Sequence, residues 1–408
     1  FVNDALKKGA AGAVVRKSWF VSEKEQKLPL LRVNDPLVAL QMIALNYRRS
    51  IATKIIAVTG SCGKTTVKEM ISQILSRMTS VAKTEGNYNN HIGLPISILC
   101  MDKTSRYGIF ELGINHIGEM DILCRILEPD WGIVTTIAPV HIEFFKTEEN
   151  VACEKKKLLL SLNQNGLAFV DGDSRYSSFL CRDLKTQCIK VGQANDNDYR
   201  VSVICDNIFE LECVQEQVRK RISISIPGRH NVKNAAIAAA VAHQLKTPWE
   251  TIIEALRNFV SVPMRWEEKI IGGVKFINDA YNANPCSMKA AIETFAQMPV
   301  KGKKWLVLGS MKELGDISVR AHEELGEFIG GLQWGGLIVI GAEAFKIAES
   351  AIAKGMDRQK VFKCNSHGEI IKILLANVTV SDTVLLKASR SIVLEKVLEL
   401  FETANKAT

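Results

Sequence analysis

Apolar residues follow two different spacings in the first half of the chain. Short uninterrupted apolar runs are typical of strands buried on both faces, and apolar residues that recur every three or four positions are typical of amphipathic helices. Runs of the two kinds alternate as strand 55–58, helix 67–78, strand 107–112, helix 118–127, strand 131–137 and helix 148–162. Because such alternation is the pattern of parallel sheets with helices on their faces, it predicts a doubly wound, mostly parallel α/β sheet.

The pattern differs on both sides of this segment. Residues 1–50 hold a small αβ pattern, and residues 166–226 hold short strand-like runs between polar turns, which predict an antiparallel annex on the same domain. A helix is expected from His230 to about Leu245, and a new series of strands and helices begins after Trp266. We therefore expect a partial N-terminal α/β domain at 1–50, a central domain at 51–266 and a C-terminal Rossmann-like α/β domain at 267–408.

The composition is that of a globular protein. Of the 408 residues, 47% are hydrophobic and 24% are charged, and the formal net charge is +8. This charge suits a polyanionic small substrate such as a nucleotide, and no basic tract is dense enough to predict nucleic-acid binding. The longest aliphatic run, at 235–242, is far shorter than the ~20 residues that a membrane span needs, so no span is expected.

The cysteines are numerous but follow no pattern. All ten lie outside CxxC pairs and outside Cys/His clusters with the spacing of a zinc site. Neither a disulfide framework nor a structural zinc is therefore expected, and free thiols in a reducing cytosol are the preferred interpretation.

The segment 58–66 reads VTGSCGKTT and lies between a predicted strand and a predicted helix. In this order, Gly60 and Gly63 allow backbone N–H groups to turn toward a phosphate, and the helix N-terminus adds its dipole. Lys64 can neutralise phosphate charge, and the hydroxyl of Thr65 can bind Mg²⁺. The loop predicts a nucleotide site, against the alternative of an ordinary glycine-rich turn with a solvated lysine.

The shortened loop resembles that of the Mur ligase family, ATP-dependent enzymes that form amide bonds. Further segments are similar to motifs of that family, in the same order: TEGNYNNHIGLP (84–95), FELGINHIGEM (110–120), APVHIEFF (138–145), PGRHNVKNAA (227–236), MRW (264–266), INDAYNANPCSM (277–288), VLGSMKELG (307–315) and LLKASRS (385–391). The similarity covers the chain almost to its C-terminus, and it implies an N-terminal domain that is cut short here.

The resemblance also implies an activity. The forms YNANP and VLGSMKELG are similar to those of the branch that joins D-alanyl-D-alanine to UDP-N-acetylmuramoyl-tripeptide. The resemblance therefore implies an ADP-forming ligase of peptidoglycan and cell wall synthesis, with ATP and Mg²⁺ as cofactors. We further expect a monomer in the cytoplasm.

Site residues follow from the same resemblance. The expected catalytic residues are Lys64, Glu111, His141 and Lys155, and the expected metal ligands are Thr65, Glu111, His141 and a carbamylated Lys155. The expected ATP-binding residues are Thr59, Gly60, Ser61, Cys62, Gly63, Lys64, Thr65, Thr66, Asn231, Asn234, Arg265 and Asp279. The expected substrate-binding residues are Thr84, Asn87, Asn89, Asn90, Tyr281, Asn282 and Asn284.

Two features of the sequence fit a carbamate on Lys155. A carbamate forms only on a neutral amine, and the cationic neighbours Lys156 and Lys157 are expected to lower the pKa of Lys155. Lys155 also shares a helical face with the apolar Val151 and Leu158, so its stem is expected to point inward. The alternative is three solvated lysines on an amphipathic helix.

Two other functions remain open at this point. A related ligase that adds a single amino acid to a UDP-muramoyl peptide, or glutamate to folate, would share the loop, although YNANP differs from the YAHNP-like form of those relatives. A P-loop switch or binding module would also share the loop, and it would not need Glu111, His141 and Lys155 together.

Overall fold

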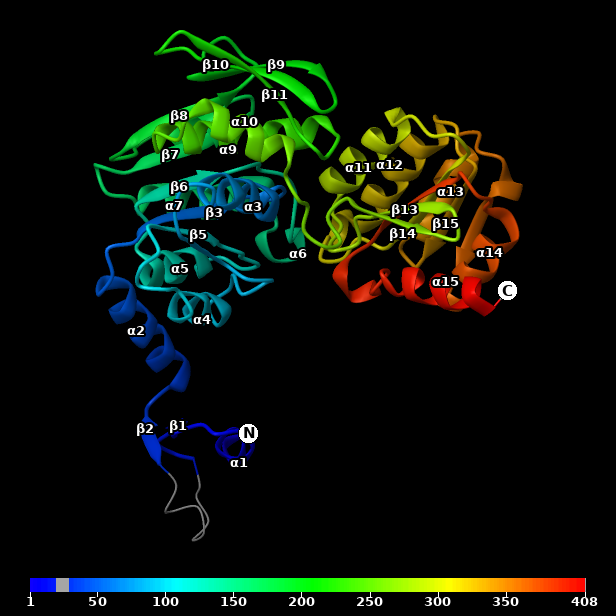
Figure 1. Cartoon of the computed structure of the whole chain (residues 1–408). Coiled ribbons are helices and arrows are strands. Elements are labelled where there is room, and N and C mark those ends of the chain that lie inside the picture. The colour runs from blue at the N-terminus through cyan, green and yellow to red at the C-terminus, as the bar shows by residue number, and fades with distance from the viewer. Residues whose placement is uncertain (20–28, 408) are drawn as a thin grey trace.

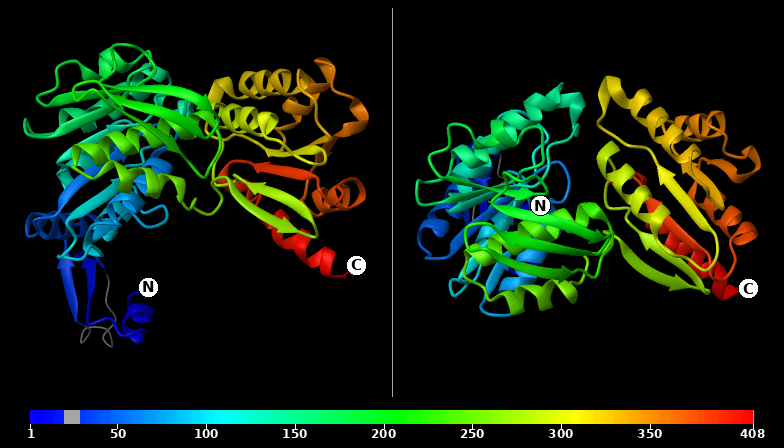
Figure 2. Two further views of the ribbon diagram at one scale, coloured as in Figure 1. Left: turned by 45° about the horizontal axis from the view of Figure 1, so that its top comes forward. Right: turned by 90° about the horizontal axis from the view of Figure 1, so that it is seen from above.

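The computed structural model describes residues 1–19 and 29–407, and its strands form three separate sheets. Figure 1 shows the nine-stranded and the six-stranded sheet side by side, with the two-stranded sheet at the far end of a long helix. The views of Figure 2 show the same separation from two other sides. Within the described ranges, no helix combines the length and the apolar content needed to cross a bilayer.

The nine-stranded sheet is parallel over most of its width. Its strands lie in the order β11 (Val218–Ser223), β10 (Ile208–Cys213), β9 (Tyr199–Cys205), β8 (Gln187–Gly192), β7 (Leu167–Asp171), β6 (Trp131–Val134), β3 (Lys54–Thr59), β5 (Tyr107–Glu111) and β4 (Val81–Lys83). Every pair from β4 across to β9 is parallel. The predicted doubly wound, mostly parallel sheet is confirmed.

The predicted antiparallel annex is confirmed only for β9, β10 and β11. It is wrong for β7 and β8, which pair in parallel with β6 and with each other. The reason is that α7 (Glu148–Leu160) and α8 (Ser177–Cys181) connect these strands. A helical crossover returns the chain to the edge of the sheet where it started, so the next strand runs in the same direction.

Helices cover both faces of this sheet. Along β3, Ile56 and Val58 face one core and Ile55 and Ala57 face the other, because side chains alternate along a strand. The first core is covered by α3 (Lys64–Leu75), α9 (Arg229–Gln244) and α10 (Trp249–Arg257), and the second by α4 (Gly93–Leu99), α5 (Glu119–Leu127) and α7.

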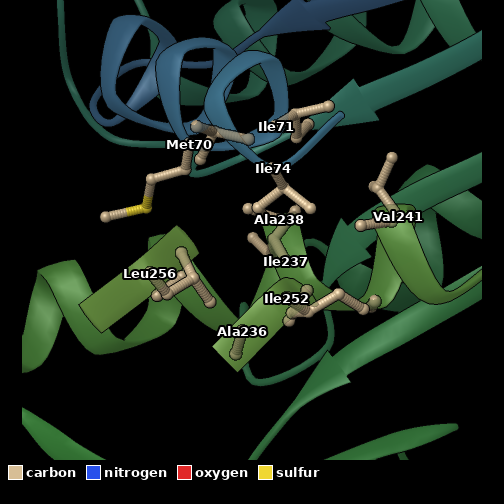
Figure 3. Packing of buried hydrophobic residues seen from close by; sticks show 14 of the residues in the cluster. Met70, Ile71, Ile74, Ala236, Ile237, Ala238, Val241, Ile252 and Leu256 are labelled. Carbon is tan, nitrogen blue, oxygen red and sulfur yellow. The ribbon is translucent and has the colours of Figure 1, made fainter. Parts of the chain in front are cut away.

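Figure 3 shows the first core where α3 meets α9. Ile71 and Ile74 of α3 are fully buried, and Ala238 of α9 lies next to Ile74 between the two helices. Because the distance between packed helices depends on the side chains between them, this small side chain allows a close approach. At the start of α3, Gly63 lies close to Asn234 of α9, so α9 also bounds the loop that precedes α3.

The six-stranded sheet is parallel except at one edge. Its order is β12 (Glu267–Ile271), β13 (Val274–Asn278), β17 (Thr383–Lys387), β14 (Lys304–Gly309), β15 (Gly336–Ile340) and β16 (Val361–Cys364), with β12 antiparallel to β13. One face packs on α11 (Pro285–Gln297), α12 (Ser318–Gly330) and α13 (Phe345–Ala353), and the other on α14 (His367–Asn377) and α15 (Lys396–Ala407). The predicted Rossmann-like α/β arrangement is confirmed.

The first residues form a small parallel pair, β1 (Ala13–Arg16) and β2 (Leu30–Val33), beside the short helix α1 (Val2–Lys7). The helix α2 (Pro36–Arg49) follows and packs on α4 and α5. Near the end of α2, Arg48 donates to Oδ2 of Asp130 at 3.1 Å. These contacts join α2 to the nine-stranded sheet.

Cysteines depart from the expectation in one place. Cys181 at the end of α8 and Cys188 in β8 form a disulfide, so the expectation of free thiols is wrong for this pair. The chain reverses over a sequence separation of 7 and brings their Cα atoms to 5.7 Å. The other eight cysteines are free: Cys62, Cys100, Cys124, Cys153, Cys205, Cys213, Cys286 and Cys364.

Candidate functional site

The predicted phosphate loop lies between Thr59, the last residue of β3, and Lys64, the first residue of α3. Gly60 (φ 149°) and Gly63 (φ 83°) adopt a backbone conformation that side chains disfavour. A Cβ atom on Gly63 would lie 2.3 Å from Oδ1 of Asn234 in α9. Glycine is therefore required where the loop passes between β3 and α9.

Side chains of the loop are already oriented. The ammonium of Lys64 donates to the carbonyl of Gly60 at 2.9 Å. The hydroxyl of Ser61 donates to the carbonyl of Ala138 and accepts from its N–H, each at 2.9 Å. Burial lowers the pKa of Lys64, and the negative charge of Glu111 opposes this shift. The loop thus presents its lysine close to an acidic strand end.

Oxygen atoms gather around Glu111, the last residue of β5. Its Oε2 accepts from the Thr65 hydroxyl at 2.7 Å, and its Oε1 accepts from the amide of Asn89 at 2.9 Å. The hydroxyl of Thr84 accepts from the N–H of Glu111 at 3.0 Å, and Arg265 donates to the hydroxyl of Thr65 at 3.3 Å. Carboxylate and hydroxyl oxygens are the ligands that Mg²⁺ prefers.

Lys155 lies on α7 and is only 2% exposed. Burial lowers the pKa of its amine well below the ordinary value, and the charge of Lys64 lowers it further. The predicted inward orientation is confirmed, but the predicted cause of the shift is wrong. Lys156 packs over an aromatic ring and Lys157 forms an ion pair with Asp121 at 2.7 Å, so neither is a main cause of the lowered pKa.

His141 precedes α6 (Ile142–Phe145) and has a left-handed backbone, φ 52°. Its Nδ1 contacts Oε2 of Glu313, which lies in the part of the chain that forms the six-stranded sheet. Burial lowers the pKa of His141; Glu313 opposes the shift, and the charges of Lys64 and Lys155 reinforce it. The two lysines therefore lie close enough to act on the ring. Glu313 was missed as a site residue, although its segment VLGSMKELG was among the recognised motifs.

The six-stranded sheet contributes a second group of charges. Nζ of Lys387, at the end of β17, donates to Oδ2 of Asp279 at 2.6 Å. The other oxygen of Asp279, Oδ1, accepts from the N–H of Trp266 at 3.3 Å. The guanidinium of Arg265 lies 4.3 Å above the ring of Tyr281. These contacts orient Asp279 and Arg265 at the edge that faces the loop.

A cavity separates the two sheets at this edge. Ten of the twelve residues predicted to bind ATP line it, and only Thr59 and Gly60 do not. From the six-stranded segment, Asp279, Asn282 and Asn284 face the loop. A second cavity adjoins the first and is lined by residues of both segments, among them Ser61, Lys64, His141, Tyr281, Glu313 and Arg390.

The predicted substrate-binding residues in 84–95 differ from one another in burial and in contacts. Thr84 is fully buried, so the structure makes it a support for Glu111 rather than a surface ligand. Asn89 contacts Glu111 directly. Oδ1 of Asn90 accepts from the N–H groups at the start of α4, and Asn87 is exposed. Within this set, Thr84 and Asn89 contact Glu111.

Fold and site together define a P-loop protein with a cavity for a nucleotide between two α/β sheets. The profile of the Mur ligase middle domain matches residues 58–242, and that of the Mur ligase glutamate ligase domain matches residues 264–390. The chain is 33% identical over 400 residues to the UDP-N-acetylmuramoyl-tripeptide–D-alanyl-D-alanine ligase of Bacillus subtilis, covering 98% of this chain and 86% of that protein. The chain belongs to the Mur ligase family.

Solved structures agree with this assignment. The MurF ligase of Thermotoga maritima in complex with ADP is similar with a TM-score of 0.85 and 28% identity, covering 100% of this chain and 92% of that one. MurF of Acinetobacter baumannii is similar with a TM-score of 0.86 and 27% identity, covering 98% and 87%. Both matches extend over all three sheets described above.

Proposed function

We propose that the chain is an ATP-dependent, ADP-forming ligase that adds D-alanyl-D-alanine to UDP-N-acetylmuramoyl-tripeptide in peptidoglycan precursor synthesis. The observation that carries the proposal is the cavity in which the phosphate loop and the Asp279 segment face each other. The name of the Bacillus subtilis relative and the ADP bound by the Thermotoga maritima MurF support the same reaction.

The residues around the cavity suit the activation of a carboxylate. An amine does not displace hydroxide from a carboxylate, whereas phosphate is a good leaving group. In the proposed reaction the γ-phosphoryl group of ATP moves to the carboxylate of the tripeptide and gives an acyl phosphate. Lys64 and Arg265 neutralise phosphate charge, and catalysis rests on positioning and electrostatic stabilisation.

We assign the amine to the second cavity, which adjoins the loop at Ser61 and Lys64. There the amine of D-alanyl-D-alanine attacks the acyl carbon and phosphate leaves. Arg390, in the segment LLKASRS, lines this cavity and carries a charge complementary to the dipeptide carboxylate. The attacking amine must lose a proton, and His141 lines the same cavity as a candidate acceptor, because its lowered pKa keeps it neutral near pH 7.

The oxygen set fits Mg²⁺, which would be held by Thr65, Glu111 and a carbamate on Lys155, with His141 beside them. The bound ion would supply charge neutralisation to the phosphates. The Lys155 amine also fits the carbamate, since it is buried, its pKa is lowered, and only its neutral form reacts with CO₂. A carbamate would also restore a negative charge beside Lys64.

We further propose domain boundaries at residues 50 and 266, and a monomer that acts in the cytoplasm. The phosphate loop and Asp279 belong to different domains in this division, so ATP binding is expected to draw them together by hinge closure. The contact between His141 and Glu313 crosses the same gap.

Phosphate release tests the proposed function. ATP turnover is expected only when the UDP-muramoyl-tripeptide and D-alanyl-D-alanine are both present, and tripeptides that differ in their third residue will define the substrate. Rapid hydrolysis with neither substrate contradicts the proposal. Turnover with a single amino acid, or with glutamate and a folate, in place of the dipeptide would assign the chain to another ligase type.

The role of Lys155 is tested by Lys155→Ala, with Lys157→Ala on the same helix as the matched control. Lys155→Ala is expected to abolish ligation while nucleotide still binds, because the loop residues remain intact. Carbon-13 NMR of the protein under labelled CO₂ is expected to show a carbamate signal in the control and in the unmodified chain. A carbamate signal that persists in Lys155→Ala contradicts the assignment.

A further inference from the structure

Two free thiols from different sheets meet in the nucleotide cavity. Cys62 belongs to the phosphate loop, and Cys286 belongs to the first turn of α11. The thiol of Cys62 donates to Oδ1 of Asn284 at 3.3 Å, and the thiols of Cys62 and Cys286 hydrogen-bond to each other. Cys62 and Asn284, which are 222 positions apart in the chain, are thus in direct contact across the cavity.

The surroundings favour a thiolate at Cys62. Cys62 lies immediately before Gly63, the N-cap of α3, and it contacts Asn284, the N-cap of α11. The positive end of α3 therefore lies beside this residue. The hydrogen bond from Cys286 lowers the pKa of Cys62 to about 6, and the charges of Lys64 and Lys387 act in the same direction.

The partner thiol has the opposite character. The hydrogen bond with Cys62 raises the pKa of Cys286, so this residue keeps its proton when Cys62 has lost its own. One reactive thiolate beside one protonated thiol is the arrangement of a pair in which the first sulfur is oxidised and the second resolves it.

We propose that Cys62 is a site of covalent oxidation by peroxides, and that Cys286 resolves it to a disulfide that ties the phosphate loop to α11. The Cys62 thiolate attacks one oxygen of hydrogen peroxide, forms a sulfenic acid and releases hydroxide, which takes up a proton to become water. The sulfur of Cys286 then displaces the hydroxyl group as a second water and loses its proton. Two thiols give up two electrons, and one peroxide becomes two waters.

The disulfide is expected to exclude the nucleotide. The two sulfurs line the same cavity as Lys64 and Asp279, so a covalent bond between them crosses the space between the loop and α11. In the proposed function, on which this step rests, ATP or ADP lies between the phosphate loop and the Asp279 segment and covers Cys62. Nucleotide and disulfide are therefore mutually exclusive, and oxidation prevents nucleotide binding until a thiol reduces the disulfide.

The test is peptide mapping after graded peroxide treatment of the full-length protein. A peptide that links Cys62 to Cys286 is expected in the free protein, is expected to be absent when ADP is saturating, and is expected to disappear with a thiol reductant. ADP binding, measured on the same samples, is expected to be lost and regained in parallel. The peptide readout does not depend on which substrates the enzyme uses.

Two variants separate the roles. Cys286→Ser is expected to lose the linked peptide and to leave Cys62 as a sulfenic acid that dimedone traps. Cys205→Ser, which removes an exposed thiol outside the cavity, is the matched control and is expected to keep the linked peptide. The proposal is overturned if Cys205 oxidises at lower peroxide than Cys62, or if the linked peptide forms equally with saturating ADP.

Discussion

Replacing Asp279 by asparagine removes one charge of a nearly buried ion pair and keeps the shape of the side chain. Lys387 is 3% exposed and Asp279 is 16% exposed at the side chain, and Nζ lies 2.6 Å from Oδ2. Asparagine leaves the ammonium of Lys387 without a counter-charge in a site that solvent hardly reaches. The change therefore tests how much the pair stabilises the six-stranded sheet.

The size of the expected loss of stability depends on the contacts that Lys387 keeps. Removing one partner of a buried ion pair costs about 3–5 kcal/mol, because the other charge is left uncompensated. Lys387 would still donate to the backbone carbonyls of Asp279 at 3.3 Å and Asn282 at 3.1 Å. We therefore expect the lower end of that range, about 3 kcal/mol, which is roughly a hundredfold change in the opening equilibrium.

Hydrogen exchange of backbone amides in β13 and β17 is the assay. These strands pair in parallel next to the ion pair, with Asn278 opposite Leu386. Their amide exchange is expected to quicken by about two orders of magnitude, because exchange of core amides follows the free energy of opening. ADP affinity is expected to fall as well, since Asp279 lines the nucleotide cavity.

Glu324→Gln is the matched control in the same segment. Glu324 pairs with Arg320 on the exposed surface of α12 at 2.7 Å, with both side chains more than half exposed. Such a pair contributes about 0.5 kcal/mol or less. If Asp279→Asn quickens exchange no more than this control does, the reasoning about the buried pair is refuted.

Three further predictions concern the loop, the core and pH. Gly63→Ala is expected to weaken ADP binding in a titration, because its Cβ would lie 2.3 Å from Oδ1 of Asn234 and φ is 83°. Ile74→Ala, in the core between α3 and α9, is expected to lower the free energy of unfolding by about 2–5 kcal/mol in urea. Burial lowers the pKa of His230 from 6.5 to about 4, so between these two pH values the unfolded chain binds a proton that the native chain does not bind. Stability is expected to fall as pH drops from 6.5 to 4, and His230→Gln is expected to flatten this slope; an unchanged slope counts against the burial argument.

Local signals explain the parts of the fold that could be predicted. The loop 58–66 was recognisable because its glycines, lysine and flanking apolar periodicities are all within one strand, turn and helix. Strand–helix alternation predicted both parallel sheets for the same reason. The annex was predicted less well, because the direction of β7 and β8 depends on helical crossovers such as α8, which is five residues long and has little periodicity to detect.

The sequence by itself determined that a glycine-rich loop with a lysine joins a strand to a helix, that the acidic Glu111 ends a strand, and that Lys155 points inward, since each depends on residues close together in the chain. Only the tertiary structure decided that burial and Lys64, rather than Lys156 and Lys157, lower the pKa of Lys155. It alone placed Glu313 against His141, 172 positions away, and Cys286 against Cys62. The physical reason is that these contacts depend on how the nine-stranded and the six-stranded sheet pack against each other, and local side-chain spacing carries no information about that packing.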